Sequence, residues 1–242
     1  MALEWRDRAA LAGALLIAAA CVRLGVWQLD RLRQRRARSV QVLATRSRPP
    51  IPVAGSLSTD SARDRRLFAR GAYDYARERL WHGRSYEGVP GVDLVTPLRL
   101  PDGTVVLVDR GWAPSPDGYH VDQGAYREGD SAEVLGIGVT APRAPGDVDP
   151  AALRDSLPYA LLPFVIQELP SSPTSPTSLT SPNLHQRPVR WPAPELSDGP
   201  HLSYAIQWFS FAVIIVVGSF ALAKKRAVEL QTSLRGTNNA LS

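Results

Sequence analysis

The sequence predicts a membrane protein in which two transmembrane α-helices flank a mainly β (α+β) extracytoplasmic domain. Three observations predict this fold class: an apolar run near each end of the 242-residue chain, and several short segments rich in β-branched residues between them. A chain of this length can hold one domain of ordinary size in addition to two membrane helices.

The first apolar run extends from Ala9 to Trp27 and predicts a transmembrane helix over residues 9–28. Its length is close to the roughly 20 residues that a helix needs to cross a hydrocarbon core of about 30 Å. A cleaved signal peptide is the alternative, but its apolar part is usually about 7–15 residues long and ends in small residues. Because this run ends in Trp27 and a group of arginines, we favour a retained anchor, preceded by a cytoplasmic tail over residues 1–8.

The second apolar run carries no charge between Leu202 and Ala223 and is followed directly by two lysines and an arginine. It predicts a transmembrane helix over residues 200–223. Basic residues concentrate on the cytoplasmic side of membrane helices, so residues 224–242 are expected to form a second cytoplasmic tail.

The arginine-rich segment 31–38 conflicts with this orientation. By the same charge rule it would hold the start of the central domain in the cytoplasm. Long domains cross membranes largely regardless of charge, so we let the second helix decide and predict a multi-pass protein of the bacterial plasma membrane with both termini cytoplasmic. An amphipathic helix lying on anionic headgroups would account for the arginines, with membrane lipids as partners.

The central domain is expected over residues 29–198, with the arginine-rich segment at its start. A low-complexity stretch rich in Pro, Ser and Thr predicts a loop over residues 170–182. A short helix is expected around residues 149–157. The predicted strands are short, β-branched or aromatic, and bounded by Gly, Pro or Asp; they are residues 67–75, 92–100, 104–112 and 132–139.

The clearest local signal is a hairpin. Two β-type segments, residues 94–100 and 104–108, are joined by Pro101, Asp102 and Gly103, which are typical turn residues. Pro97 lies within the first segment, and a proline cannot donate to a strand ladder. We therefore expect that strand to lie at a sheet edge or a bulge.

Arg110 and Trp112 are expected to be structural. They are two residues apart near the end of a strand, so their side chains should share one face of the sheet. A guanidinium stacked on the indole ring would contribute about 0.5–1 kcal/mol at a partly exposed site.

Composition excludes a nucleic-acid binder. The net charge of +5 comes almost wholly from arginines, which are dispersed apart from segment 31–38. A nucleic-acid binder would carry a basic stripe interleaved with aromatic residues and a recognisable module, and neither is present.

Residues that carry enzyme chemistry do not form a recognisable motif. The single cysteine, Cys21, lies in the first apolar run, which excludes an intramolecular disulfide and a thiolate metal cluster. Gly83 and Ser85 begin a nucleophile-elbow pattern, but Glu87 stands where its second glycine should be. We therefore expect that the protein is not an enzyme and has no catalytic residue and no bound metal. An unrecognised membrane enzyme is kept as a third hypothesis, after the two functions described below.

Isolated polar residues have simpler explanations than chemistry. A solvated strand edge accounts for Asp109 at least as well as catalysis does. Three of the histidines lie in polar surroundings and are expected to be exposed; these are His82, His120 and His185. His201 differs, because it falls in the first turn of the second membrane helix.

Arg23 lies at membrane depth, where an ionised group needs a partner. At 1.5 Å per residue it is roughly 6 Å below Trp27, and Tyr204 and Gln207 lie roughly 6 and 10 Å below Pro200 in the second helix. A contact between Arg23 and one of these two residues is one interpretation. A side chain that extends outward to the headgroups is the other.

Three motifs resemble those of the bacterial, actinobacterial-type members of the surfeit-locus family of cytochrome c oxidase assembly proteins. Residues 24–31 resemble the Gly-x-Trp-Gln-x-x-Arg signature that closes the family's first helix. Residues 91–112 resemble its central hairpin, and residues 200–209 resemble the start of its second helix. The positions that carry the likeness include Gly25, Trp27, Gln28, Arg31, Arg110, Gly111, Trp112, Tyr204, Gln207 and Trp208.

The resemblance implies an assembly or stabilising factor for haem-copper cytochrome c oxidase that helps to insert haem a and is not an enzyme. Its partners would be cytochrome c oxidase subunits, with the cytochrome bc complex as a further partner in a respiratory supercomplex. His201 is the candidate haem ligand, although a histidine beside Tyr204 and Trp208 is also typical of an interfacial anchor. The alternative function is a structural accessory subunit of the mature oxidase, packed through small residues such as Ala205, Ala212 and Gly218.

Overall fold

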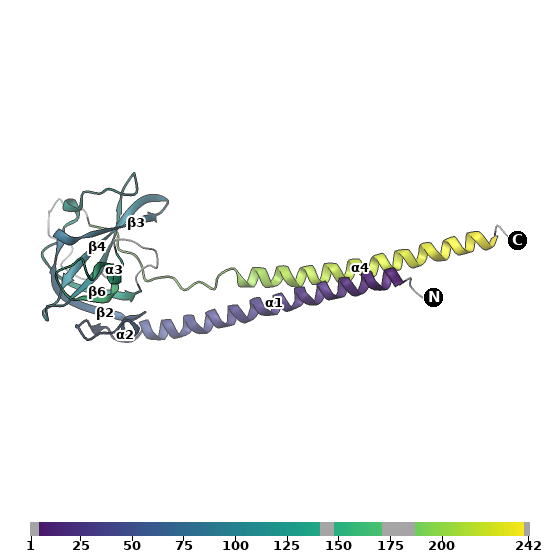
Figure 1. Ribbon diagram of the computed structural model, residues 1–242, viewed down its shortest axis with the longest axis horizontal. Coiled ribbons are helices and arrows are strands. Elements are labelled where there is room, and N and C mark those ends of the chain that lie inside the picture. Colours follow the sequence, from purple (N-terminus) through teal and green to yellow (C-terminus); the bar gives the residue numbers. More distant parts are fainter. Residues whose placement is uncertain (1–4, 141–147, 171–186, 240–242) are drawn as a thin grey trace. The chain divides into compact units, whose positions relative to one another are not determined.

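The computed structural model describes residues 5–140, 148–170 and 187–239, which form two compact units (Figure 1). The first unit comprises residues 1–40 and 196–242, and the second comprises residues 41–195. Helix α1 (Trp5–Arg46) contributes to both units, while helix α4 (His201–Asn239) belongs to the first. The strands all belong to the second.

Both long helices extend well past the predicted membrane segments. Helix α1 has 42 residues and continues beyond residue 28, so segment 31–38 is part of this helix and does not begin the β domain. Neither Gly nor Pro occurs between Gly25 and Pro49, and Arg, Leu, Gln and Ala are good helix formers, so nothing stops the helix earlier. Helix α4 continues past residue 223 for the same reason.

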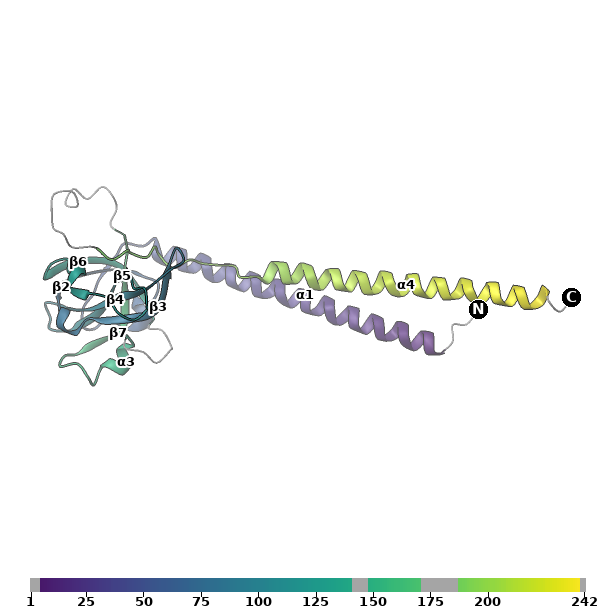
Figure 2. The same ribbon diagram turned by 90° about the horizontal axis from the view of Figure 1, so that it is seen from above.

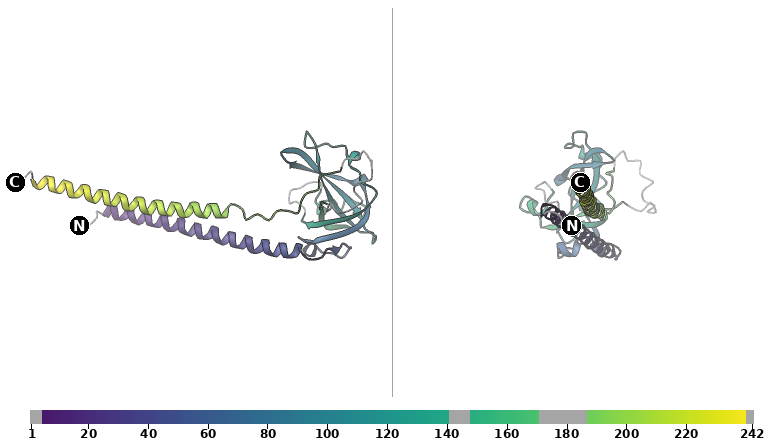
Figure 3. Two further views of the ribbon diagram at one scale, coloured as in Figure 1. Left: turned by 180° about the vertical axis from the view of Figure 1, so that it is seen from behind. Right: turned by 90° about the vertical axis from the view of Figure 1, so that its right-hand side faces the viewer.

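The two helices of the first unit lie antiparallel and side by side, with the start of α1 and the end of α4 at the same end of the pair (Figures 1 and 3). Side chains meet at intervals along the whole seam. The contacts join Arg36 to Asp198, Gln28 to His201, Gly25 to Phe209, Cys21 to Ala212, and Asp7 to Arg226. A Cβ at position 25 would lie 2.7 Å from the ring of Phe209, so glycine allows this close approach.

We expect an engineered disulfide to test this seam. Cys21 and Ala212 belong to one buried cluster, so Ala212→Cys places a second thiol near the native one. Oxidation should then join the two and block labelling by a maleimide-polyethylene glycol, which is read as a gel shift. Val213 occupies the next position in the chain and is 61% exposed. The Val213→Cys variant is therefore the control and should still be labelled after oxidation. Equal labelling of the two variants would contradict the helix register.

Both helices are long and apolar enough to cross a membrane, by length and composition. Large apolar side chains cover their outer faces, among them Leu16, Ile17, Ile214 and Val217, each more than half exposed. Such extensive exposed apolar surface is unusual on a protein surrounded by water. The polar contacts made by Asp7 and Gln28 are 21 residues apart on α1, or about 32 Å, which matches the hydrocarbon thickness.

Of the two interpretations of Arg23, the contact with Tyr204 or Gln207 is not the one that the structure shows. Arg23 and Gln207 are both exposed, and Arg23 makes no hydrogen bond or ion pair with another described residue. Arg23 precedes Gly25 by two residues, which turns it about 200° away from the seam that Gly25 lines.

The second unit is a small β-barrel (Figure 2). Its strands follow the order β1-β2-β6-β7-β5-β4-β3, and a further pairing of β2 with β4 joins five of them into a closed ring. The strands are β1 (Ile51–Pro52), β2 (Arg66–Tyr73), β3 (Arg79–Tyr86), β4 (Val89–Arg99), β5 (Val105–Pro114), β6 (Ser131–Val139) and β7 (Leu161–Glu168). The short helices are α2 (Thr59–Ala62), α3 (Pro150–Leu153) and two 3₁₀ turns, η1 (Tyr75–Arg77) and η2 (Gln123–Tyr126).

The four predicted strands correspond to β2, β4, β5 and β6. Strands β3 and β7 were not predicted, because β3 carries several charged or polar residues and a glycine and β7 contains Pro163. The helix expected at residues 149–157 is the single turn α3, capped by the Asp149 side chain. The loop predicted at residues 170–182 lies, except for Pro170, outside the described residues.

The predicted hairpin is confirmed as β4–β5, with Gly103 in the left-handed region at φ +84°. Strand β4 is not an edge strand, since it lies between β3 and β5. Its pairing with β3 ends at Val95 and its pairing with β2 begins at Leu98. Pro97 therefore lies where the strand changes neighbours and no donor is needed.

The barrel interior is apolar along most of its length and charged at one end. Alternate residues of β5 and β7 point inward and form one buried cluster with residues of β2, β4 and β6. The same alternation continues from Val106 and Val108 to Arg110, and from Phe164 and Ile166 to Glu168. The barrel therefore directs an arginine and a glutamate into its interior end.

Candidate functional site

Arg110 is fully buried at this end of the barrel and all three of its nitrogens have partners. Its Nη2 donates to Glu78 Oε2 at 2.6 Å, and its Nη1 donates to Glu128 Oε2 at 3.0 Å. Nη1 also donates to the carbonyl oxygen of Tyr126 at 2.7 Å, and Nε donates to Thr96 Oγ1 at 2.8 Å. Such charge-assisted bonds are about twice as strong as neutral ones, so they fix the guanidinium firmly.

The guanidinium of Arg110 stacks on two tyrosines. Its central carbon lies 5.6 Å from the ring centre of Tyr73 and 5.1 Å from that of Tyr75. The expected stacking on Trp112 is wrong, because Gly111 has φ +111° and redirects the strand between the two residues. Burial raises the pKa of Tyr73 well above its usual value, so its phenol stays neutral.

A second arginine joins this network from the segment that returns from the barrel toward α4. We call residues 187–195 the return segment. Arg190 Nη2 donates to Glu128 Oε2 at 2.7 Å and to Glu168 Oε1 at 3.1 Å, and Nη1 donates to the carbonyl oxygen of Arg110. The network thus links β5, β7 and the return segment through paired buried charges.

The return segment is also attached along the rest of its length. Val189 exchanges backbone hydrogen bonds with Trp112, at 2.7 and 2.9 Å. Gln167 donates to the carbonyl oxygen of Pro192 at 2.7 Å, and Arg46 donates to that of Pro194 at 2.6 Å. A Cβ at Gly111 would collide with the backbone of Val189, so the tight approach requires glycine there.

Two carboxyl groups are buried beside the return segment. Asp93 Oδ1 accepts from Trp191 Nε1 at 2.8 Å, and its Oδ2 accepts from Arg84 Nε at 2.5 Å. Asp109 Oδ1 accepts from the backbone N–H of Gly111 at 2.9 Å. The solvated position expected for Asp109 is wrong, since it is 2% exposed; burial and the charge of Asp93 raise the pKa of Asp109 to about 8.

Asp109 should make the stability of the barrel depend on pH. Between its ordinary pKa of 3.8 and about 8, the unfolded chain is ionised at this position while the folded chain keeps the proton. Each pH unit across this window should lower the free energy of unfolding by up to about 1.4 kcal/mol. Asp109→Asn should flatten the fall in the urea midpoint between pH 5 and 8, measured by circular dichroism of the full chain in detergent. An equally steep fall in the variant would contradict a neutral Asp109.

The second cluster of polar groups is on the helix pair. His201 Nδ1 donates to Gln28 Oε1 at 2.8 Å. The other ring nitrogen, Nε2, is buried and has no hydrogen-bond partner among the described residues. Because Nδ1 carries the proton in this bond, Nε2 of the neutral ring keeps its lone pair.

Only some of the sequence-predicted positions belong to these two clusters. Gly25 and Gln28 contact α4, whereas Trp27 and Arg31 are exposed; Trp208 is half-buried in the seam and Tyr204 is 46% exposed. Arg110, Gly111 and Trp112 lie in the barrel network. His82 and His120 are exposed as expected, and His185 lies outside the described residues.

Sequence reasoning missed most of the barrel network. Its unpredicted members include Glu78, Asp93, Glu128, Glu168, Arg190 and Trp191. Only the alternation along β5 could have indicated that Arg110 faces inward, since it follows Val106 and Val108 at intervals of two. Its partners are distant in sequence and carry no local pattern.

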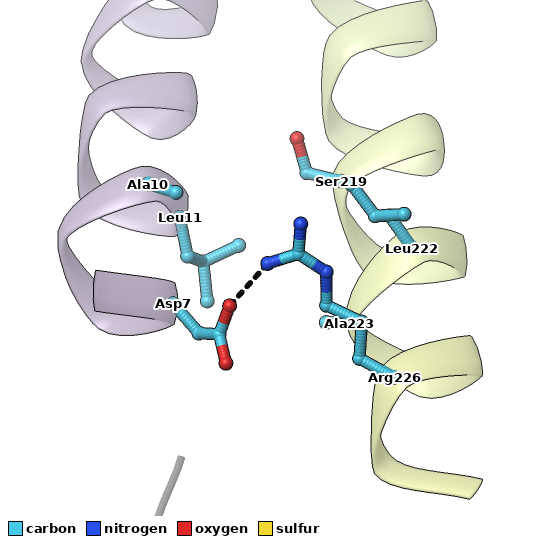
Figure 4. Close-up of a pocket in the computed structure, with 7 residues that line it drawn as sticks. All are labelled: Asp7, Ala10, Leu11, Ser219, Leu222, Ala223 and Arg226. Atoms are coloured by element: carbon cyan, nitrogen blue, oxygen red, sulfur yellow. Dashed lines mark hydrogen bonds and ion pairs between the residues drawn. The ribbon is translucent and has the colours of Figure 1, made fainter. Parts of the chain in front are cut away.

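A small cavity of about 120 Å³ lies at the other end of the helix pair (Figure 4). Arg226 forms an ion pair with Asp7 across it. The remaining lining is mostly apolar: Ala10, Leu11, Ser219, Leu222 and Ala223. Within the described residues, no group of three or more His, Cys, Asp or Glu could hold a metal ion.

These features define a class of protein: a small β-barrel whose chain begins and ends in two apolar, mutually packed helices. Comparisons of the sequence with known proteins identify a family. A model of the SURF1 family matches residues 15–213. SURF1-like protein Mb2259 of Mycobacterium bovis and SURF1-like protein Rv2235 of Mycobacterium tuberculosis are each 30% identical to the chain over 230 residues, covering 84% of it and 79% of the relative.

The chain belongs to the SURF1 family, the surfeit-locus family that its motifs resemble. This family is linked to the assembly of cytochrome oxidase, and its members act as assembly factors rather than as enzymes.

Proposed function

We propose that this protein is an assembly or stabilising factor for haem-copper cytochrome c oxidase, held in the bacterial plasma membrane by α1 and α4. Family membership and the two exposed apolar helices support the proposal. In this arrangement both termini are cytoplasmic and the barrel is extracytoplasmic, as the basic residues after the apolar part of α4 favour.

Haem a is the group that we propose the protein handles, with His201 as its ligand. The observation that carries this step is the buried Nε2 of His201, an acceptor without a partner among the described residues. The bond from Nδ1 to Gln28 is the kind of second contact that fixes the tautomer of a ligating histidine and raises its basicity. These residues would hold the haem through Nε2 of His201.

The bound haem would supply the redox-active iron of the oxidase. This chain would contribute Nε2 of His201 at the outer end of the helix pair, and Gln28 would orient the ring. Trp208 lies about two turns further along α4, where it is half-buried in the seam. Because a single histidine would hold the haem, its binding would be labile, as suits a carrier.

We expect His201→Ala to abolish retention of haem a by the purified protein. The Gln28→Ala variant keeps His201 but removes the hydrogen bond that orients its imidazole ring. It should weaken haem retention about 10–100-fold. His82→Ala, an exposed histidine of the barrel, is the matched control and should retain haem fully. The measurement is the absorption spectrum of protein expressed with haem a synthesis intact.

Two outcomes would contradict the haem assignment. Equal haem content in wild type and His201→Ala would remove His201 as a ligand. Absence of haem from both proteins would favour the alternative, an accessory subunit of the mature oxidase or of a supercomplex with the cytochrome bc complex.

The accessory-subunit alternative rests on the outer faces of the helices. Ala205 and Ala212 are buried in the seam, so these small residues pack within the pair and do not face a neighbour. Gly218 is exposed, and the nearby Val217 and Phe220 are 62% and 59% exposed. Purification of the oxidase in native lipids tests this reading: a stoichiometric amount of this chain favours a subunit, and its absence favours a transient assembly factor.

A further inference from the structure

Arg23, Trp27 and Arg31 form one face of α1. They are spaced by four residues, so their side chains follow one another on successive turns. Arg23 and Trp27 are each two residues from Gly25, which places them about 200° around the helix from the contact with Phe209. This face therefore turns away from α4.

The two arginines of this face lack acidic partners among the described residues, whereas two other arginines of α1 have them. Arg33 pairs with Asp30 at 3.3 Å, and Arg36 pairs with Asp198 at 2.9 Å. Among the described residues, Arg31 has only a hydrogen bond to the Gln34 amide at 3.1 Å, and Arg23 has no polar partner. Two permanent positive charges thus remain available on one side of the helix.

The position of Arg23 favours an anionic ligand. It is five residues, or about 7.5 Å, below Gln28, the outermost polar contact of the apolar part of the seam. A charged side chain exposed to lipid at that depth is costly unless it reaches a counter-charge at the interface. To reach that interface, the long side chain of Arg23 would extend toward Trp27, and Arg31 lies one turn beyond Trp27 on the same face.

We propose that Arg23, Trp27 and Arg31 bind the headgroup of an anionic phospholipid in the outer leaflet, a site that rests on the proposed membrane insertion. Guanidinium groups bind phosphate through paired hydrogen bonds. The ring of Trp27 is 48% exposed and has the character of an interfacial aromatic, apolar on its faces with a polar N–H. Two arginines on either side of this ring hold one phosphate at the boundary of the bilayer.

The test uses the full chain in phosphatidylcholine vesicles containing spin-labelled phosphatidylglycerol or spin-labelled phosphatidylcholine. Flotation of the vesicles first measures insertion. Electron spin resonance then measures the fraction of each labelled lipid immobilised by the protein. Wild type should prefer phosphatidylglycerol, and Arg23→Gln and Arg31→Gln should each lower the preference by up to about fivefold.

Arg33→Gln is the matched control, because it removes the same charge from an arginine that pairs with Asp30 on another face. It should keep the wild-type preference. Equal preference in wild type and the Arg23 and Arg31 variants, or an equal loss in Arg33→Gln, would overturn the site. The preference for phosphatidylglycerol could also be lost when inorganic phosphate is added but kept in chloride of equal ionic strength. This result would overturn the lipid site and make it a site for soluble phosphate. Failure of the chain to float would instead overturn the proposed insertion.

Discussion

Replacing Arg110 by methionine is expected to lower the free energy of unfolding by about 3–5 kcal/mol, because it leaves the buried carboxylate of Glu78 without its counter-charge. Glu78 has a side chain that is 1% exposed and depends on Arg110 for its only ion pair among the described residues. Methionine fills a similar volume, so the loss would come from charge and hydrogen bonding and not from a cavity. Urea unfolding of the full chain in detergent, followed by circular dichroism, measures it.

Two further variants isolate the cause. Arg187 is 67% exposed and lies 4.0 Å from Glu128, so Arg187→Ala should cost less than about 1 kcal/mol. Adding Glu78→Gln to Arg110→Met removes the orphaned charge and should recover part of the stability. If Arg187→Ala lowers the free energy of unfolding as much as Arg110→Met does, the loss comes from the change in net charge and not from breaking the buried ion pair.

Trp112→Ala is expected to cost roughly 3–5 kcal/mol, the range for removal of a buried aromatic side chain. Trp112 is 6% exposed, its ring lies 5.5 Å from that of Tyr86, and its backbone holds Val189 of the return segment. Its Nε1 is buried without a hydrogen-bond partner among the described residues. Trp112→Phe gives up no hydrogen bond seen in the structure and should cost much less.

Two measurements on both variants, thermal unfolding and oxidase assembly in cells, distinguish a structural role of Trp112 from a role in binding a partner. Loss of stability in Trp112→Ala with near-wild-type behaviour of Trp112→Phe supports a packing role. An unchanged melting curve together with lost oxidase activity would instead make Trp112 a contact residue for a partner.

The predictable parts of the barrel were those with local signals. The β4–β5 hairpin follows from alternating β-branched residues around a Pro-Asp-Gly turn, which act over a few residues. The network around Arg110 could not be predicted, because its closure depends on strand register and joins Glu78 and Arg190, 112 positions apart in the sequence. Register is a property of the whole barrel and not of any one segment.

The helices show a different limit of sequence reasoning. Hydropathy indicates which residues suit a bilayer, and it located both apolar segments. It does not indicate where a helix stops, which depends on residues that break the helix. Helix α1 therefore continues past residue 28 to Arg46, close to Pro49, and the arginine-rich segment became helical. Arg23 and Gln207 lie at similar depths in the predicted membrane segments, but this does not predict a contact between them. Depth does not determine which side of a helix a residue occupies.

Closure of the barrel also protects the protein against unwanted sheet growth. An open sheet offers unpaired N–H and C=O groups on which another copy can add a strand. Here the described outer strands are β1, with two residues including Pro52, and β3. Strand β3 carries Arg79 and Arg84, and its register shifts beside Gly83, at φ +72°. Charge, irregular register and a proline thus make both edges poor templates, so copies of this barrel should resist aggregation through strand pairing.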